Sequence, residues 1–264
     1  MSNASSKTAA AGPAVPATLA VPWKPWLGVV FVFFVYYASQ VVAGNLLLLY
    51  PTLRHWSAKQ TDQWVNNSVG AQFVFILLAE ALTVGAIYWF LRHYRVGFGR
   101  IGLKRPRWSD PLYGLLAVPA YYLIYLISVA VVSHFVPALN VNQQQQIGFN
   151  DVHGSWPLIM TFVSLVVLPP LVEEIMVRGF LYGTLKKIMP VVYAAVLTSL
   201  LFAAAHLPEG GHGGPLYIAA LDTFILSLVL VYLRELTGNL WASITLHAVK
   251  NGVAFLSLFV FHIK

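Results

Sequence analysis

The sequence predicts an all-α protein, a polytopic transmembrane helix bundle of about seven spans, or eight if one apolar stretch is divided. Of its 264 residues 58% are hydrophobic and only 9% are charged, and the mean hydropathy is +0.72. A soluble globular protein carries about 25% charged residues, so this composition indicates a membrane protein. The apolar residues also form runs of about 20, the length of a helix that crosses a bilayer.

The net charge and the absence of cysteine limit the partners and the kinds of site that this protein can have. The net charge of +7 and the pI of about 9.6 are explained by basic loops that hold helices against an anionic cytoplasmic leaflet. No patch combines aromatic and basic residues, so we expect the lipid bilayer as a partner and no nucleic acid. The absence of cysteine excludes disulfides, thiolate metal sites and a cysteine nucleophile.

The chain divides into a short tail and one long apolar domain. Residues 1–22 are mostly Ala, Pro, Ser and Thr, and Lys7 is the single charged side chain among them. Such a segment is predicted to be a flexible tail. Residues 23–264 are predicted to form a single transmembrane domain. Because the tail lacks the compact apolar core of a cleavable signal peptide, the first span is expected to act as an uncleaved anchor.

Seven apolar stretches are candidate spans. Their predicted bounds are about 26–50, 69–91, 112–136, 156–187, 191–207, 216–233 and 240–261. The most basic loop, residues 92–107, should be cytoplasmic because positive loops stay inside. We therefore expect an integral multi-pass protein of a bacterial cytoplasmic membrane, with its N-terminus cytoplasmic and its C-terminus outside.

The fourth span carries three ionisable groups in apolar surroundings, Glu173, Glu174 and Arg178. A charge at the bilayer centre costs at least ~2.5–3.5 kcal/mol, so such groups indicate a functional site. Glu174 and Arg178 are i and i+4 and can form an ion pair, whereas Glu173 points about 100° away and stays free. Pro169 and Pro170 are predicted to break or kink this helix, and freed carbonyls are tolerated beside a cavity.

Polar residues of two other spans are predicted to meet Glu173. Glu173 lies about 15 residues before the turn near residue 188, and His206 lies about 17 residues after it, which gives them similar depths. His247 and Asn251 are i and i+4 on the last span, a few ångströms shallower. Phe202, one turn from His206, can brace its ring.

A glutamate, two histidines and an asparagine in a shielded pocket can activate water and stabilise an oxyanion, which suggests amide hydrolysis. The motifs of other intramembrane proteases are absent from the sequence: there is no His-Glu-x-x-His zinc motif and no Gly-x-Ser-Gly nucleophile motif. Asp222 is the single Asp within the predicted spans, so a pair of catalytic aspartates is excluded. A dyad of Ser243 with His247 is a weaker alternative because it leaves Glu173 and His206 unused.

Three motifs in order carry a family resemblance. They are Glu173-Glu174-x-x-x-Arg178, Phe202-x-x-x-His206 and His247-x-x-x-Asn251. Over residues 165–255 the chain closely resembles the CPBP family of intramembrane proteases, which includes CAAX prenyl endopeptidases and bacteriocin-processing or immunity proteins. The resemblance implies a catalytic core at about 156–262.

The same resemblance implies roles for individual residues. Glu173 would be the general base and His206 its partner in activating water, while His247 and Asn251 would hold the oxyanion. Glu174 and Arg178 would orient the site, supported by Phe202.

The resemblance leaves the cofactor and the substrate open. No cofactor is required, but zinc held by Glu173, His206 and His247, as in a metalloprotease, is an alternative. The expected substrate is a membrane-associated peptide or protein, and whether it is lipidated stays open.

Two other functional classes remain as alternatives. A related protein could act as a non-proteolytic membrane scaffold or bacteriocin-immunity partner, and a transporter would also place charges at mid-membrane. Asp222 and Glu80, both inside spans, can either face the site or bond a neighbouring helix.

Overall fold

The computed structural model describes residues 21–143, 145, 148–149 and 152–262, and these residues form helices and turns without a strand. The elements are α1 (Pro25–Leu53), α2 (Ala58–Asn67), α3 (Val69–His93), η1 (Phe98–Ile101), α4 (Ser109–Phe135), α5 (Ser155–Phe162), η2 (Val163–Val167), α6 (Leu168–Glu173), η3 (Glu174–Leu181), α7 (Tyr182–Leu185), α8 (Val191–Ala205), η4 (Leu207–Gly213), α9 (Tyr217–Thr237), α10 (Trp241–Phe255) and η5 (Leu256–Val260). The predicted all-α class is confirmed.

Within the described residues, seven helices are long and apolar enough to cross a membrane, as the sequence predicts. They are Pro25–Leu53, Val69–His93, Ser109–Phe135, Ser155–Leu185, Val191–Gly210, Tyr217–Thr237 and Trp241–Val260. Short α2 stands apart because it is polar. Ser57 caps its first turn by accepting from the Gln60 N–H, and the Gln60 side chain accepts from the Ser57 N–H in return.

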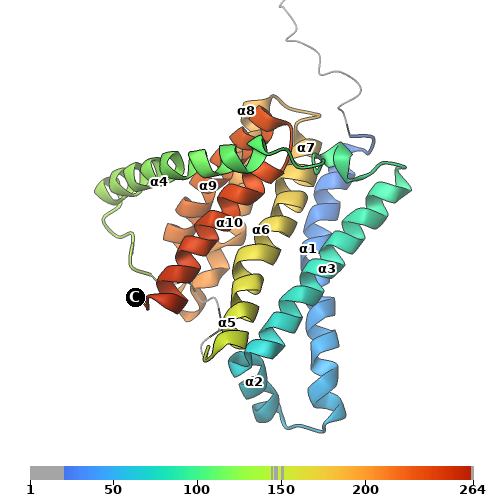
Figure 1. The fold of residues 1–264 in the computed structure, drawn as a ribbon, viewed down its shortest axis with the longest axis vertical. Coiled ribbons are helices and arrows are strands. Elements are labelled where there is room, and N and C mark those ends of the chain that lie inside the picture. Colours follow the sequence, from blue (N-terminus) through green and yellow to red (C-terminus); the bar gives the residue numbers. More distant parts are fainter. Residues whose placement is uncertain (1–20, 144, 146–147, 150–151, 263–264) are drawn as a thin grey trace, which may run out of the picture.

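The two ends of the bundle differ in charge. The start of α1, the α7–α8 turn and the connection from α3 to α4 lie at one end, drawn at the top of Figure 1, whereas α2 and the last described residues lie at the other. We call the first the basic end. Ten basic residues gather there, by their places in the chain: Lys24, Arg92, Arg95, Arg100, Lys104, Arg105, Arg107, Lys186, Lys187 and Arg234.

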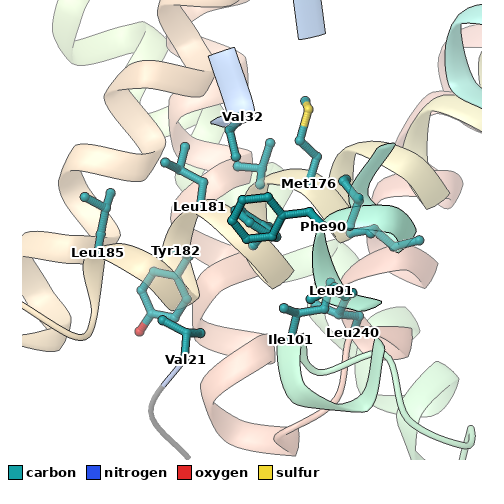
Figure 2. Packing of buried hydrophobic residues seen from close by; sticks show 14 of the residues in the cluster. Val21, Val32, Phe90, Leu91, Ile101, Met176, Leu181, Tyr182, Leu185 and Leu240 are labelled. Atoms are coloured by element: carbon teal, nitrogen blue, oxygen red, sulfur yellow. The ribbon is translucent and has the colours of Figure 1, made fainter. Parts of the chain in front are cut away.

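An aromatic core joins α1 and α3 to the fourth span near the basic end. The fully buried Trp23 stacks on Phe180 with ring centroids 4.6 Å apart, and its Nε1 donates to Thr184 at 2.9 Å. Phe90 of α3 meets the same cluster, shown in Figure 2 with Val21 beside Tyr182. Residues 1–20 of the predicted tail lie outside the described residues, whereas Val21 is buried in this core.

Helix α4 crosses α9 and α10 at a steep angle and packs against both (Figure 1). A glycine permits this approach: a Cβ added at Gly114 would lie 2.6 Å from the carbonyl oxygen of Ala242 and 2.7 Å from Thr245 Cβ. Since real Cβ atoms do not approach backbone so closely, a side chain at position 114 would push α4 away from α10.

The fourth span excludes one of the two effects predicted for its prolines, a break in the helix. Pro169 and Pro170 do not break the helix, which runs from Ser155 to Leu185 through five consecutive helical segments. The π-helical turns η2 and η3 flank α6 and take up the backbone change, as π-bulges commonly do at functional sites. The predicted proline effect therefore appears as a change of helical pitch.

Candidate active site

A cavity of about 230 Å³ lies among the last four spans, and the four residues predicted as catalytic line it together. Glu173 comes from the end of α6, His206 from the end of α8, and His247 and Asn251 from α10. Phe202 of α8 lines the same cavity. Three spans thus contribute the set, consistent with the depth estimated by residue counting.

Glu174 is the buried centre of the site. Its Oε1 accepts from Arg178 Nη1 at 2.8 Å and contacts His247 Nδ1 at 3.0 Å. The side chains of Glu174 and Arg178 are both 0% exposed. The predicted ion pair is confirmed, and its unforeseen partner is His247, so this carboxylate ties the fourth span to the seventh.

In each of the two histidines, a hydrogen bond shows which ring nitrogen carries a proton. An ionised carboxylate and a backbone carbonyl can only accept, so Nδ1 of His247 donates to Glu174 and Nδ1 of His206 donates to the Phe202 carbonyl at 2.8 Å. Nε2 of each ring therefore faces a different carboxylate. His247 Nε2 lies 3.7 Å from Glu173 Oε2, and His206 Nε2 lies 4.0 Å from Glu209 Oε1.

Asn251 caps a carbonyl that the prolines leave open. Its Nδ2 donates to the Leu165 carbonyl oxygen at 3.0 Å. The residues four and five positions after Leu165, whose N–H groups would normally reach this oxygen, are Pro169 and Pro170, and neither has an N–H. Asn251 therefore holds α10 against the proline turn, and its second amide hydrogen stays available.

Phe202 packs against the charged groups of the site. The Arg178 guanidinium lies 4.3 Å from the centroid of its ring, and the His206 ring lies 4.8 Å away, edge on. Within the described part of the chain, Arg178 Nε and Nη2 have no hydrogen-bond partner. The buried guanidinium consequently depends on Glu174 and on the face of this ring.

The structure adds cavity residues that the sequence analysis left outside its list. Asp222 accepts from the Tyr121 hydroxyl and pairs with Lys250 Nζ at 3.0 Å, and both charged residues line the cavity. Glu209 and Gln145 also line it, joined by a hydrogen bond of 2.5 Å. The sequence contains a signal that could have predicted the pair of Asp222 and Lys250, since each is a charged residue inside an apolar span.

Two sequence-based alternatives gain no geometric support. Among the described residues, no group of three or more His, Cys, Asp or Glu is placed to hold a metal ion, so the zinc set of Glu173, His206 and His247 does not fit. The Ser243 hydroxyl has no hydrogen-bond partner there, and His247 Nδ1 is taken by Glu174. Glu80 is not among the residues that line the cavity.

Comparison with protein families gives one match that bears on the site. Residues 155–253 match the model for type II CAAX prenyl endopeptidase Rce1-like. The matched segment is similar to Rce1-like endopeptidases. It runs from the start of α5 into α10 and so contains Glu173, His206, His247 and Asn251. No curated protein and no solved structure matches the chain.

This match confirms the resemblance to the CAAX protease family inferred from the motifs. It supports an endopeptidase of the CAAX type embedded in a membrane. Helices α1 to α4 precede the matched region and contribute the aromatic core and the α4 support described above.

Proposed function

We propose that this protein is an intramembrane endopeptidase in which Glu173 activates the hydrolytic water directly. The observation that carries the proposal is the 3.7 Å separation of Glu173 Oε2 and His247 Nε2 inside the cavity. At that distance one water can contact both groups. The Glu173 side chain is 24% exposed, which leaves it accessible to that water, whereas Glu174 is fully enclosed.

The reaction proceeds by general base catalysis. Glu173 takes a proton from water, whose oxygen bonds to the carbonyl carbon of the scissile peptide, and the carbonyl oxygen becomes an oxyanion. The C–N bond then breaks, and the proton held by Glu173 passes to the leaving nitrogen. A positioned base of this kind contributes about 10²–10⁴-fold to the rate.

The remaining residues stabilise the charge that develops. Asn251 donates its second amide hydrogen to the oxyanion, and His247 donates from Nε2 when its ring is protonated. Removing one such donor typically costs about 10²–10³-fold in kcat. His206 supports water activation through Nε2, since its Nδ1 is held by the Phe202 carbonyl.

The substrate is proposed to be a peptide or membrane protein reached from within the bilayer. The excess of basic residues at one end of the bundle supports a cytoplasmic basic end and a cytoplasmic N-terminus.

The test is cleavage of a panel of reporter peptides, with and without a lipidated C-terminal motif, by the purified full chain in lipid. Glu173→Gln and His206→Ala should lose at least about 100-fold of the activity while the thermal unfolding midpoint stays near wild type. Asp62→Asn, which removes an exposed carboxylate of α2 outside the cavity, is the matched control. A scaffold or a transporter would leave the wild type inactive toward every peptide, which would overturn the proposal.

A further inference from the structure

A second, larger cavity of about 540 Å³ opens at the basic end, away from the catalytic cavity. It lies between residue Val21, the η1 turn, the fourth span and the end of α9. Its charged lining consists of Arg100, Lys104, Lys186, Lys187, Arg234 and Glu235. Nothing in the proposed peptidase chemistry uses this site.

The charges of the cavity are unbalanced. The lining holds five basic side chains and one carboxylate, Glu235, which lies 2.5 Å from Lys186 Nζ, so positive charge is in excess. Such a field attracts anions and concentrates them locally.

Two of these cations have N–H groups without an acceptor among the described residues. Among the described residues, the Lys104 ammonium makes no hydrogen bond or ion pair, and Arg234 Nε is buried without a partner. Arg234 Nη2 reaches the Ile101 carbonyl only at 3.4 Å. A buried guanidinium nitrogen without an acceptor is costly, and a bound anion would supply one.

The backbone also suits an anion. Three glycines, Gly99, Gly183 and Gly238, line the hollow, and a Cβ added at any of them would meet no atom nearer than 3.9 Å, so a ligand can approach the chain closely there. The volume lies within the range of small-molecule sites.

We propose that this cavity binds the phosphate headgroup of an anionic phospholipid. Basic pockets between transmembrane helices at the cytoplasmic level are typical of lipid headgroup sites. The cavity lies at the ends of two spans, where α7 stops and α9 ends, so a headgroup at the bilayer surface meets it. This location favours a lipid over a free phosphate ion, and the inference is independent of the peptidase proposal.

The experiment measures lipid binding by native mass spectrometry of the full chain purified in detergent. Phosphatidylglycerol is titrated against wild type, Lys104→Gln and the double variant Lys104→Gln/Arg234→Gln. Lys104 is exposed, so its replacement leaves the fold intact even if Arg234 proves structural. Arg105→Gln is the matched control, because it removes the same charge from the next residue, which does not line the cavity.

Wild type and Arg105→Gln should bind phosphatidylglycerol alike, and Lys104→Gln should bind about fivefold more weakly, the effect of one basic residue near an anionic lipid surface. The double variant should bind more weakly still. Equal binding by all variants, or binding of phosphatidylcholine as tight as that of phosphatidylglycerol, would overturn the site. Inorganic phosphate that displaces the lipid at equal concentration would overturn the choice of a lipid.

Discussion

Glu174 Oε1 lies 3.0 Å from Nδ1 of His247, across 73 residues of sequence, with both side chains at most 5% exposed. This contact turns the opposite ring nitrogen toward Glu173. The two adjacent glutamates therefore have different roles. Glu174 orients His247 from the interior, and Glu173 faces the cavity.

Replacing Glu174 by Ala should destabilise the protein by about 3–5 kcal/mol, because Arg178 would remain buried without its carboxylate. The double variant Glu174→Leu/Arg178→Met should recover most of that loss, since it removes both charges, yet should stay inactive because His247 loses its orienting group. Thermal unfolding and peptide cleavage measured on the same preparations check both statements. A Glu174→Ala protein as stable as wild type would contradict the buried pair.

Asn251→Ala should leave the Leu165 carbonyl without a donor and cost about 1–3 kcal/mol of stability. Adding Pro169→Ala restores an N–H one turn after Leu165 and should recover part of the stability, but not the cleavage activity. The control Pro119→Ala, made in α4, should give no such rescue of Asn251→Ala. If both proline replacements act alike, the cap is not the source of the loss.

Tyr121→Phe should cost about 1.5–3 kcal/mol, the range for a hydrogen bond to a charged group, because Asp222 loses its hydroxyl donor. Tyr125→Phe, one turn away on the same helix, is the matched control and should change the unfolding midpoint little. Equal midpoints for the two variants would show that the Tyr121–Asp222 contact does not stabilise the fold.

Gly114→Ala should destabilise by about 1–3 kcal/mol through overpacking, since the added Cβ meets backbone of α10. Gly85→Ala introduces the same group in α3 where nothing lies within 4 Å, and should leave stability unchanged or raise it slightly. Chemical unfolding of the two variants in parallel gives the comparison, and a Gly114→Ala protein as stable as Gly85→Ala would refute the close contact.

Treatment of the purified protein with a strong chelator should leave peptide cleavage within about twofold of its initial rate, because Glu173 acts on water directly in the proposed mechanism. Metal content is measured on the same sample by mass spectrometry. Loss of activity that returns with added zinc, but not with magnesium, would restore the metal alternative.

Much of the fold could be predicted because it follows from local properties of the chain. The bounds of the seven spans come from apolar runs between polar turns, and α3 begins at Val69 in both the prediction and the structure. The Glu174–Arg178 pair is likewise local, since residues four apart share a helix face. Of the break or kink predicted at Pro169 and Pro170, the break does not occur, because π-helical turns on either side keep the helix continuous.

The sequence by itself determined that the chain is an apolar helix bundle and that Glu173, His206, His247 and Asn251 share a similar depth. Only the tertiary structure decided which groups touch: Asn251 with Leu165 across 86 residues, and Tyr121 with Asp222 across 101. Depth follows from counting residues along one helix, whereas the rotation and crossing of each helix depend on packing against all its neighbours. Contacts between spans therefore need coordinates.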